Sequence, residues 1–167
     1  MLESTNRDRG TENDEQGKTI YGTDGNDILD VAGDGNYLSG GEGNDELYAA
    51  PGNNNELYGD AGDDYLYVEG ANNYMSGGDG ADILKVASGN GNQVYGDEGD
   101  DELSVISGDN YLYGGDGDDH LYGCFLQAFF GESCKIFLEN IASPFWQKLQ
   151  RPVQSLREPL PATADIG

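Results

Sequence analysis

Large apolar residues recur at a fixed spacing through the middle of the chain, each between neighbours that are mostly polar or Tyr. Eleven such positions follow one another at nine or ten residues: Leu29, Leu38, Leu47, Leu57, Leu66, Met75, Leu84, Val94, Leu103, Leu112 and Leu121. In several units the alternation runs two residues further, to Val31, Val68, Val86 and Val105. A period of two is typical of a short strand with one face inward. Helices are not expected here, because every unit is rich in Gly, Asn and Asp.

A block of glycines and acids precedes every second predicted strand. The six blocks are GTDGND (22–27), GGEGND (40–45), GDAGDD (59–64), GGDGAD (77–82), GDEGDD (96–101) and GGDGDD (114–119). Their closing aspartates are separated by 18, 19, 18, 19 and 18 residues: Asp27, Asp45, Asp64, Asp82, Asp101 and Asp119. A second series of blocks lies halfway between and ends at Asn36, Asn55, Asn73, Asn92 and Asn110. This regularity predicts stacked turns, each made of two nonapeptide units.

The six blocks resemble the G-G-x-G-x-D-x-U-x consensus of the RTX (hemolysin-type) calcium-binding nonapeptide repeats. The resemblance covers residues 22–123. It implies an all-β fold, a parallel β-roll of about six turns of 18–19 residues, with successive strands alternating between two sheets. It also implies that each calcium ion is shared by two adjacent turns.

The resemblance assigns calcium-ligand roles to the closing aspartates, and carbonyl-donor roles to the block glycines and to the second and fourth block positions. The expected ligands are Asp27, Asp45, Asp64, Asp82, Asp101 and Asp119, with Gly22, Thr23, Gly25, Gly40, Gly41, Gly43, Gly59, Asp60, Gly62, Gly77, Gly78, Gly80, Gly96, Asp97, Gly99, Gly114, Gly115 and Gly117. Calcium takes roughly six to eight oxygen ligands. Stacked carboxylates about 4.8 Å apart repel one another unless a cation lies between them. Six stacked turns leave five intervening sites, so we expect about five Ca²⁺ ions.

The asparagine series departs from the family pattern, because an amide oxygen carries no charge. We call the column of closing aspartates with their blocks the Asp edge, and the column of five asparagines the Asn edge. We expect a one-sided roll, with ions on the Asp edge and stacked hydrogen-bonded asparagines on the Asn edge. Asp34 and Asp109 are isolated acids on the Asn edge. Either could complete a calcium site at one end, although a role as a solvated turn residue is the simpler interpretation.

The net charge of −24, from 32 acidic residues against eight Lys and Arg, narrows the choice of partners. It argues against nucleic acid and against anionic membrane surfaces. Five Ca²⁺ ions would carry ten positive charges and reduce the net charge from −24 to −14. The composition therefore indicates a demand for cations, and it predicts disorder in the calcium-free chain.

The segments on either side of the repeats differ from them in composition. Residues 1–19 are polar and charged and are predicted to be a disordered leader that lacks a Sec-type apolar region. The sequence contains no stretch of about 18 apolar residues, so no membrane-spanning helix is predicted. The repeat domain is expected to span residues 20–123. Residues 124–150, which hold all five Phe, Trp146 and both cysteines, are predicted to form one or two helices, and residues 151–167 to be disordered.

Three interpretations of this tail stay open. It could cap the last turn of the roll, it could be the uncleaved C-terminal export signal that the family typically carries for type I secretion, or it could be sequence unrelated to the repeats. Cys124 and Cys134 could pair in an oxidising compartment, but their spacing does not decide it.

The sequence does not predict an enzyme. His120 is the only histidine, so a His-rich zinc site cannot be built. The paired carboxylates recur in the same environment in every turn, whereas an acid–base pair needs two different environments.

The predicted function is a calcium-binding module that folds in extracellular calcium, within a bacterial protein that leaves the cell through a type I exporter. The alternative is a calcium-stabilised adhesin or glycan-binding module that uses the Tyr-rich outer faces. The tyrosines are predicted to form columns: Tyr37, Tyr74 and Tyr111 in one, Tyr58, Tyr95 and Tyr113 in a second on the same sheet, and Tyr48, Tyr65, Tyr67 and Tyr122 on the opposite sheet. Tyrosine also suits an exposed strand for structural reasons alone.

Overall fold

The computed structural model describes residues 7–9, 16–106, 108–123 and 136–139. Within these ranges every helix or strand is a strand: β1 (Arg7–Arg9), β2 (Thr19–Tyr21), β3 (Ile28–Val31), β4 (Tyr37–Glu42), β5 (Glu46–Ala49), β6 (Glu56–Ala61), β7 (Tyr65–Glu69), β8 (Tyr74–Asp79), β9 (Ile83–Ser88), β10 (Gln93–Glu98), β11 (Glu102–Val105), β12 (Asn110–Asp116), β13 (His120–Tyr122) and β14 (Ile136–Glu139). No helix in the described part of the chain is long and apolar enough to cross a membrane.

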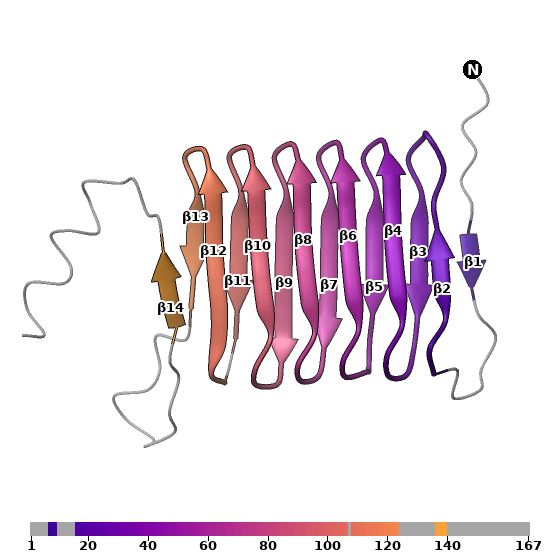
Figure 1. Cartoon of the computed structure of the whole chain (residues 1–167), viewed down its shortest axis with the longest axis horizontal. Coiled ribbons are helices and arrows are strands. Elements are labelled where there is room, and N and C mark those ends of the chain that lie inside the picture. Colours follow the sequence, from indigo (N-terminus) through magenta and orange to yellow (C-terminus); the bar gives the residue numbers. More distant parts are fainter. Residues whose placement is uncertain (1–6, 10–15, 107, 124–135, 140–167) are drawn as a thin grey trace, which may run out of the picture.

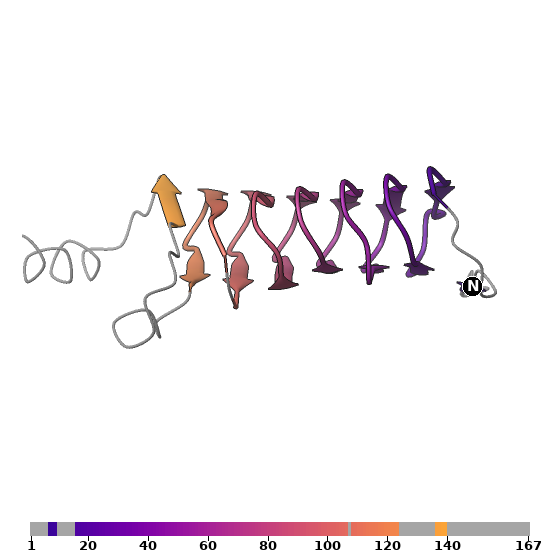
Figure 2. The same ribbon diagram turned by 90° about the horizontal axis from the view of Figure 1, so that it is seen from below.

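The strands form two parallel sheets that the chain visits alternately (Figures 1 and 2). Sheet A has the order β1-β3-β5-β7-β9-β11-β13, and sheet B has the order β14-β12-β10-β8-β6-β4-β2. Each strand therefore pairs with the strands one full turn before and after it. The parallel β-roll of about six turns that the sequence predicts is confirmed.

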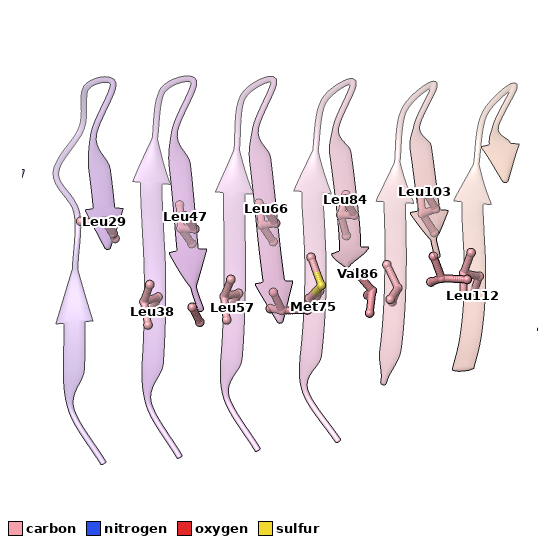
Figure 3. Packing of buried hydrophobic residues seen from close by; sticks show 14 of the residues in the cluster. Leu29, Leu38, Leu47, Leu57, Leu66, Met75, Leu84, Val86, Leu103 and Leu112 are labelled. Carbon is pink, nitrogen blue, oxygen red and sulfur yellow. The ribbon is translucent and has the colours of Figure 1, made fainter. Parts of the chain in front are cut away.

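The core is a double column of apolar side chains between the two sheets (Figure 3). One column is in register along sheet A: Leu29, Leu47, Leu66, Leu84, Leu103 and Leu121. The other is in register along sheet B: Leu38, Leu57, Met75, Val94 and Leu112. All eleven are buried, as predicted. Burying one such side chain contributes about 1.5–3 kcal/mol, so this thin core stabilises the roll by repetition.

Sheet A contributes a further column of buried side chains, two residues after the first column and closer to the Asn edge. It contains the predicted Val31, Val68, Val86 and Val105. It also contains Ala49, which is fully buried and pairs with Val31 and Val68. The sequence pattern missed Ala49 because its side chain is too small to mark an inward position.

Strands also occur in residues 1–19, for which the sequence predicts disorder, and in residues 124–150, for which it predicts helix. In residues 1–19, β1 pairs with β3 of sheet A, and Thr19 begins β2. In residues 124–150, Ile136–Glu139 forms β14, which pairs with β12 of sheet B. A sheet end offers unpaired backbone groups to any extended segment, and Ile and Phe favour strands. Residues 1–6, 10–15, 124–135 and 140–167, which include Cys124 and Cys134, lie outside the described residues.

Candidate metal centre

The closing aspartates lie in the turns that lead from each strand of sheet B to the next strand of sheet A, along the upper side of Figure 1. Five of them, Asp27, Asp45, Asp64, Asp82 and Asp101, are buried, with 1–3% of their surface exposed. Asp119, in the last Asp turn, is half-buried. Such burial is unusual for a carboxylate and requires compensating partners.

One carboxylate oxygen of each aspartate has such a partner. The backbone N–H of each closing aspartate except the last, Asp119, donates to Oδ1 of the aspartate in the following turn. The five N···O distances are 2.7 Å for Asp27 to Asp45, 2.7 Å for Asp45 to Asp64, 2.8 Å for Asp64 to Asp82, 2.8 Å for Asp82 to Asp101 and 3.1 Å for Asp101 to Asp119. The aspartates therefore form a continuous ladder along the roll.

The second oxygen, Oδ2, is buried without a hydrogen-bond donor in five of the six closing aspartates: Asp45, Asp64, Asp82, Asp101 and Asp119. Asp27 differs, because its Oδ2 accepts hydrogen bonds from the backbone N–H of Thr23 at 2.6 Å and from Thr23 Oγ1 at 2.8 Å. The sequence analysis assigns Thr23 only a carbonyl role and does not predict this side-chain contact. Leaving a buried charged oxygen without a donor is costly.

Glycine carbonyls lie beside these oxygens. A Cβ added to Gly40 would collide with Oδ2 of Asp45 and would lie 2.7 Å from the carbonyl oxygen of Gly59 in the next turn. The same pair of acceptors, the aspartate of one turn and the first glycine of the next, surrounds the first glycine of every Asp turn except the last: Gly22, Gly40, Gly59, Gly77 and Gly96. Each gap between turns thus brings two oxygen acceptors together. A hard cation such as calcium suits this environment.

The second and fourth block positions complete the predicted ligand column. Gly41, Gly78 and Gly115 have φ values of 111–120°, and a Cβ at any of them would collide with the carbonyl oxygen of the preceding turn. The fourth-position glycines of the later turns have φ values of 120–141°: Gly43, Gly62, Gly80, Gly99 and Gly117. A Cβ at any of the last four would collide with the carbonyl oxygen of the preceding turn, and a Cβ at Gly43 would collide with the backbone of Gly25. Gly25, in the first turn, has open space around it.

The structure therefore places all the predicted ligand residues in one column of turns, although it does not assign a ligand role to any single residue. Within the described ranges, no group of three or more His, Cys, Asp or Glu side chains is arranged to hold a metal.

The electrostatics of the Asp edge disfavour ionised carboxylates. Burial raises the pKa of Asp64 and Asp82 to about 7 and that of Asp101 to about 6. It also raises the pKa of Asp45 and Asp119. The ladder hydrogen bonds oppose the shift, while neighbouring carboxylates add to it. A cation among these groups would reverse the balance and favour the ionised forms.

The Asn edge has the same ladder but supplies its own donors, as the sequence predicts. The backbone N–H of each asparagine donates to Oδ1 of the next at 2.8–2.9 Å, from Asn36 through to Asn110. The Nδ2 groups of Asn36, Asn73, Asn92 and Asn110 also donate to glycine carbonyls at 3.0–3.3 Å. Asn55 is the exception, because its buried Nδ2 has no acceptor.

The two isolated acids of the Asn edge also take part in hydrogen bonds between turns. Asp34 Oδ1 accepts from the backbone N–H of Asn53 at 2.7 Å and from its Nδ2 at 3.1 Å. The backbone N–H of Asp109 donates to Oδ1 of Asn90 at 3.3 Å. These contacts favour the turn-residue interpretation over a calcium site.

The outer tyrosines of sheet B form one strip of ring contacts along the roll. From Tyr37 to Tyr111 the contacts alternate between the two predicted columns. Tyr21 extends the strip at one end, and Tyr113 contacts Tyr95 at the other. The centroid separations are 5.3–6.1 Å. In sheet A, Tyr48 contacts Tyr65 and Tyr67 in the same way. Neighbouring rings cover part of one another, so packing alone explains much of this arrangement.

Comparison with known families points to the same edge of the roll. The family model described as RTX calcium-binding nonapeptide repeat (4 copies) matches residues 21–56, 52–84 and 95–123. These ranges include more than half of the chain and all six glycine–acid blocks. No curated protein and no solved structure matches the chain.

Proposed function

Because the chain belongs to the family of RTX calcium-binding nonapeptide repeats, we propose that its Asp edge binds about five Ca²⁺ ions and that this binding folds the roll. One observation carries the proposal. Five buried Oδ2 atoms of the Asp edge have no hydrogen-bond donor, and four of them lie beside the first-glycine carbonyl of the next turn: those of Asp45, Asp64, Asp82 and Asp101. The proposed ion count comes from the repeat alone, because six stacked turns leave five gaps between them.

Calcium-dependent folding follows from the balance of energies in the turns. Without a cation, stacking the turns buries a column of carboxylates that lack donors and repel one another. The thin apolar core has to overcome this penalty. Bound calcium would supply positive charge and accept oxygen ligands from both turns that border a gap. Its binding free energy therefore becomes folding free energy, because the unfolded chain does not hold these oxygens together.

The same balance supports a role in export. Proteins with these repeats are typically secreted by type I systems. We propose that the acidic chain stays unfolded where free calcium is scarce and folds outside the cell. Extracellular calcium modules bind with dissociation constants on the order of 10⁻⁴–10⁻³ M, which suits such a switch.

A calcium titration of the full chain tests the proposed function. Far-ultraviolet circular dichroism should show a coil spectrum in chelator and a cooperative gain of β signal in millimolar calcium. Magnesium at the same concentration is the control, and it should be much less effective because it demands octahedral geometry and dehydrates reluctantly. An unchanged spectrum on calcium addition would refute the proposal.

The one-sided arrangement has its own test. Asp101→Ala should raise the calcium concentration needed for folding, because it removes a buried carboxylate from the Asp edge. Asn73→Ala should change that concentration much less, since Asn73 belongs to the Asn edge. Equal effects of the two variants would contradict a one-sided roll.

We propose no catalytic role for the described residues, since this family's β-solenoids are structural calcium-binding modules. His120 is exposed on β13, and its ring stacks on Tyr122 at 6.5 Å between centroids. The glycan-binding alternative stays a prediction. A glycan array with calcium present, comparing the protein with its Tyr74→Ser variant, would test it.

A further inference from the structure

Two turns of the Asp edge carry an aspartate where their neighbours carry glycine. In the strand register of sheet B, the second block position reads Gly41, Asp60, Gly78, Asp97 and Gly115. Asp60 and Asp97 adopt φ values of 75° and 79°, which a side chain disfavours and glycine does not. Every second turn thus has a carboxylate at a position where glycine would be less strained.

A serine of the preceding turn holds each of these carboxylates. Ser39 Oγ donates to Oδ2 of Asp60 at 2.6 Å, and Ser76 Oγ donates to Oδ2 of Asp97 at 2.5 Å. The two partners come from adjacent turns, 21 residues apart in sequence. The carboxylates of Asp60 and Asp97 therefore bridge two of the five gaps between Asp turns. We call these the bridged gaps: one between blocks 40–45 and 59–64, the other between blocks 77–82 and 96–101.

Each bridged gap also contains an oxygen that lacks a donor. In the first, Oδ2 of Asp45 is buried without a partner and lies beside the carbonyl of Gly59, the residue directly before Asp60. In the second, Oδ2 of Asp82 lies in the same way beside the carbonyl of Gly96, directly before Asp97.

The carboxylates of Asp60 and Asp97 also act electrostatically on closing aspartates. Burial is the main cause of the raised pKa of Asp45 and Asp64, and the carboxylate of Asp60 raises both further. Asp97 adds to the raised pKa of Asp101 in the same way, again after burial.

We propose that the two bridged gaps form a tighter class of calcium site than the other three gaps, because Asp60 adds a carboxylate beside the first and Asp97 adds one beside the second. This inference rests on the proposed function. The number of ligand charges sets the affinity of calcium sites over several decades. In the other three gaps the corresponding bridging position is Gly41, Gly78 or Gly115 and adds no charge. Filling the two bridged gaps docks four of the six Asp turns.

The test is a calcium-binding isotherm of the full chain at pH 8, measured by competition with a chromophoric chelator. Asp60→Asn combined with Asp97→Asn removes both charges. Asparagine tolerates positive φ and keeps an oxygen to accept from serine. The unsubstituted protein should bind two ions about tenfold more tightly than the other three, and the double variant should bind all five in one weaker class. The control is Asp79→Asn with Asp116→Asn, which removes the same charge from two exposed residues of the same edge.

A second pair of variants separates a ligand role from a structural one. Asp60→Gly with Asp97→Gly relieves the backbone strain, so a purely structural role predicts calcium binding at least as tight as before. We expect instead that the two tightly bound ions of the bridged gaps bind about tenfold more weakly. The inference is overturned if the asparagine pair keeps two tight ions, or if the control pair loses them as well. Calcium binding by the unsubstituted protein would still uphold the proposed function, whereas no binding at all would overturn both.

Discussion

The buried carboxylate of Asp82 should destabilise the roll without calcium and stabilise it with calcium. Asp82→Asn is therefore expected to change stability in opposite directions under the two conditions. Asparagine keeps an Oδ1 that can accept the N–H of Asp64, a bond of 2.8 Å in the structure. It also replaces the donorless Oδ2 with an Nδ2 that can donate, as the asparagines of the Asn edge do.

The magnitude follows from the pKa of this side chain, which is 1% exposed. Burial, opposed by a ladder hydrogen bond and aided by neighbouring carboxylates, raises its pKa from 3.8 to about 7. A shift of roughly 3 units corresponds to about 4 kcal/mol. A carboxyl whose pKa is higher in the folded state binds more protons there, so the roll loses this free energy as pH rises through about 7. At pH 8 the aspartate carries the full penalty, and the asparagine carries none.

The assay is far-ultraviolet circular dichroism with trimethylamine N-oxide as the folding agent in chelator, because this osmolyte favours compact states without a metal. At pH 8 the variant should fold at a lower osmolyte concentration than the unsubstituted protein. At about pH 3.5 the difference should vanish, because Asp82 is then protonated whether the chain is folded or not. In calcium the variant should need more of the ion to fold. Asp79→Asn, at an exposed acid of β8, is the control. Equal destabilisation in chelator and in calcium would refute the reasoning.

Three further outcomes follow from the same turns and core. Without calcium, the β signal of the unsubstituted protein should grow as pH falls from 8 toward 5, because Asp82 and its buried neighbours are protonated; a flat profile would contradict their raised pKa values. Gly59→Ala places a Cβ against the closing carboxylate of its own turn and the carbonyl of the next, so the calcium midpoint should rise sharply, whereas Gly25→Ala, with open space, should leave it nearly unchanged. Leu66→Ala should cost about 2–5 kcal/mol in urea unfolding with calcium, and Ile106→Ala, at a residue 70% exposed, should cost far less.

The features that repeat were predictable from the sequence. In a strand the side chains alternate with a period of two, so the aliphatic residue after each block had to face inward. The turns stack at one period, so the same residue type falls into register in every turn. Leu66, for example, pairs with Leu47 and Leu84, as its position in the repeat requires. The asparagine ladder follows from the same periodicity and from the donor and acceptor groups of an amide.

The features that interrupt the repeat were not predictable in this way. Ser39 lies directly before one block, and Asp60 is the second residue of the next block. Their contact joins two adjacent strands and can be recognised only once the strand register is known. The hydrogen bonds of Thr23 depend on the conformation of a single turn. Strands β1 and β14 lie outside the repeats, and their pairing depends on the open sheet ends that the repeats create.

The side chains of the two edges differ in one terminal atom, and under the proposed function that atom decides whether an edge needs an ion. Both edges stack their turns with the same hydrogen bond, from a backbone N–H to an Oδ1 one turn ahead, as in Asp64 to Asp82 and Asn73 to Asn92. They differ at the other terminal atom of the side chain. On the Asn edge that atom is nitrogen, and that of Asn92 donates to the carbonyl of Gly70. On the Asp edge it is oxygen, which cannot donate to the carbonyl beside it and which has no donor in five of the six closing aspartates. If the Asp edge binds calcium as we propose, the Asn edge can hold the turns together at any calcium concentration, and the Asp edge makes the completed roll conditional on the ion.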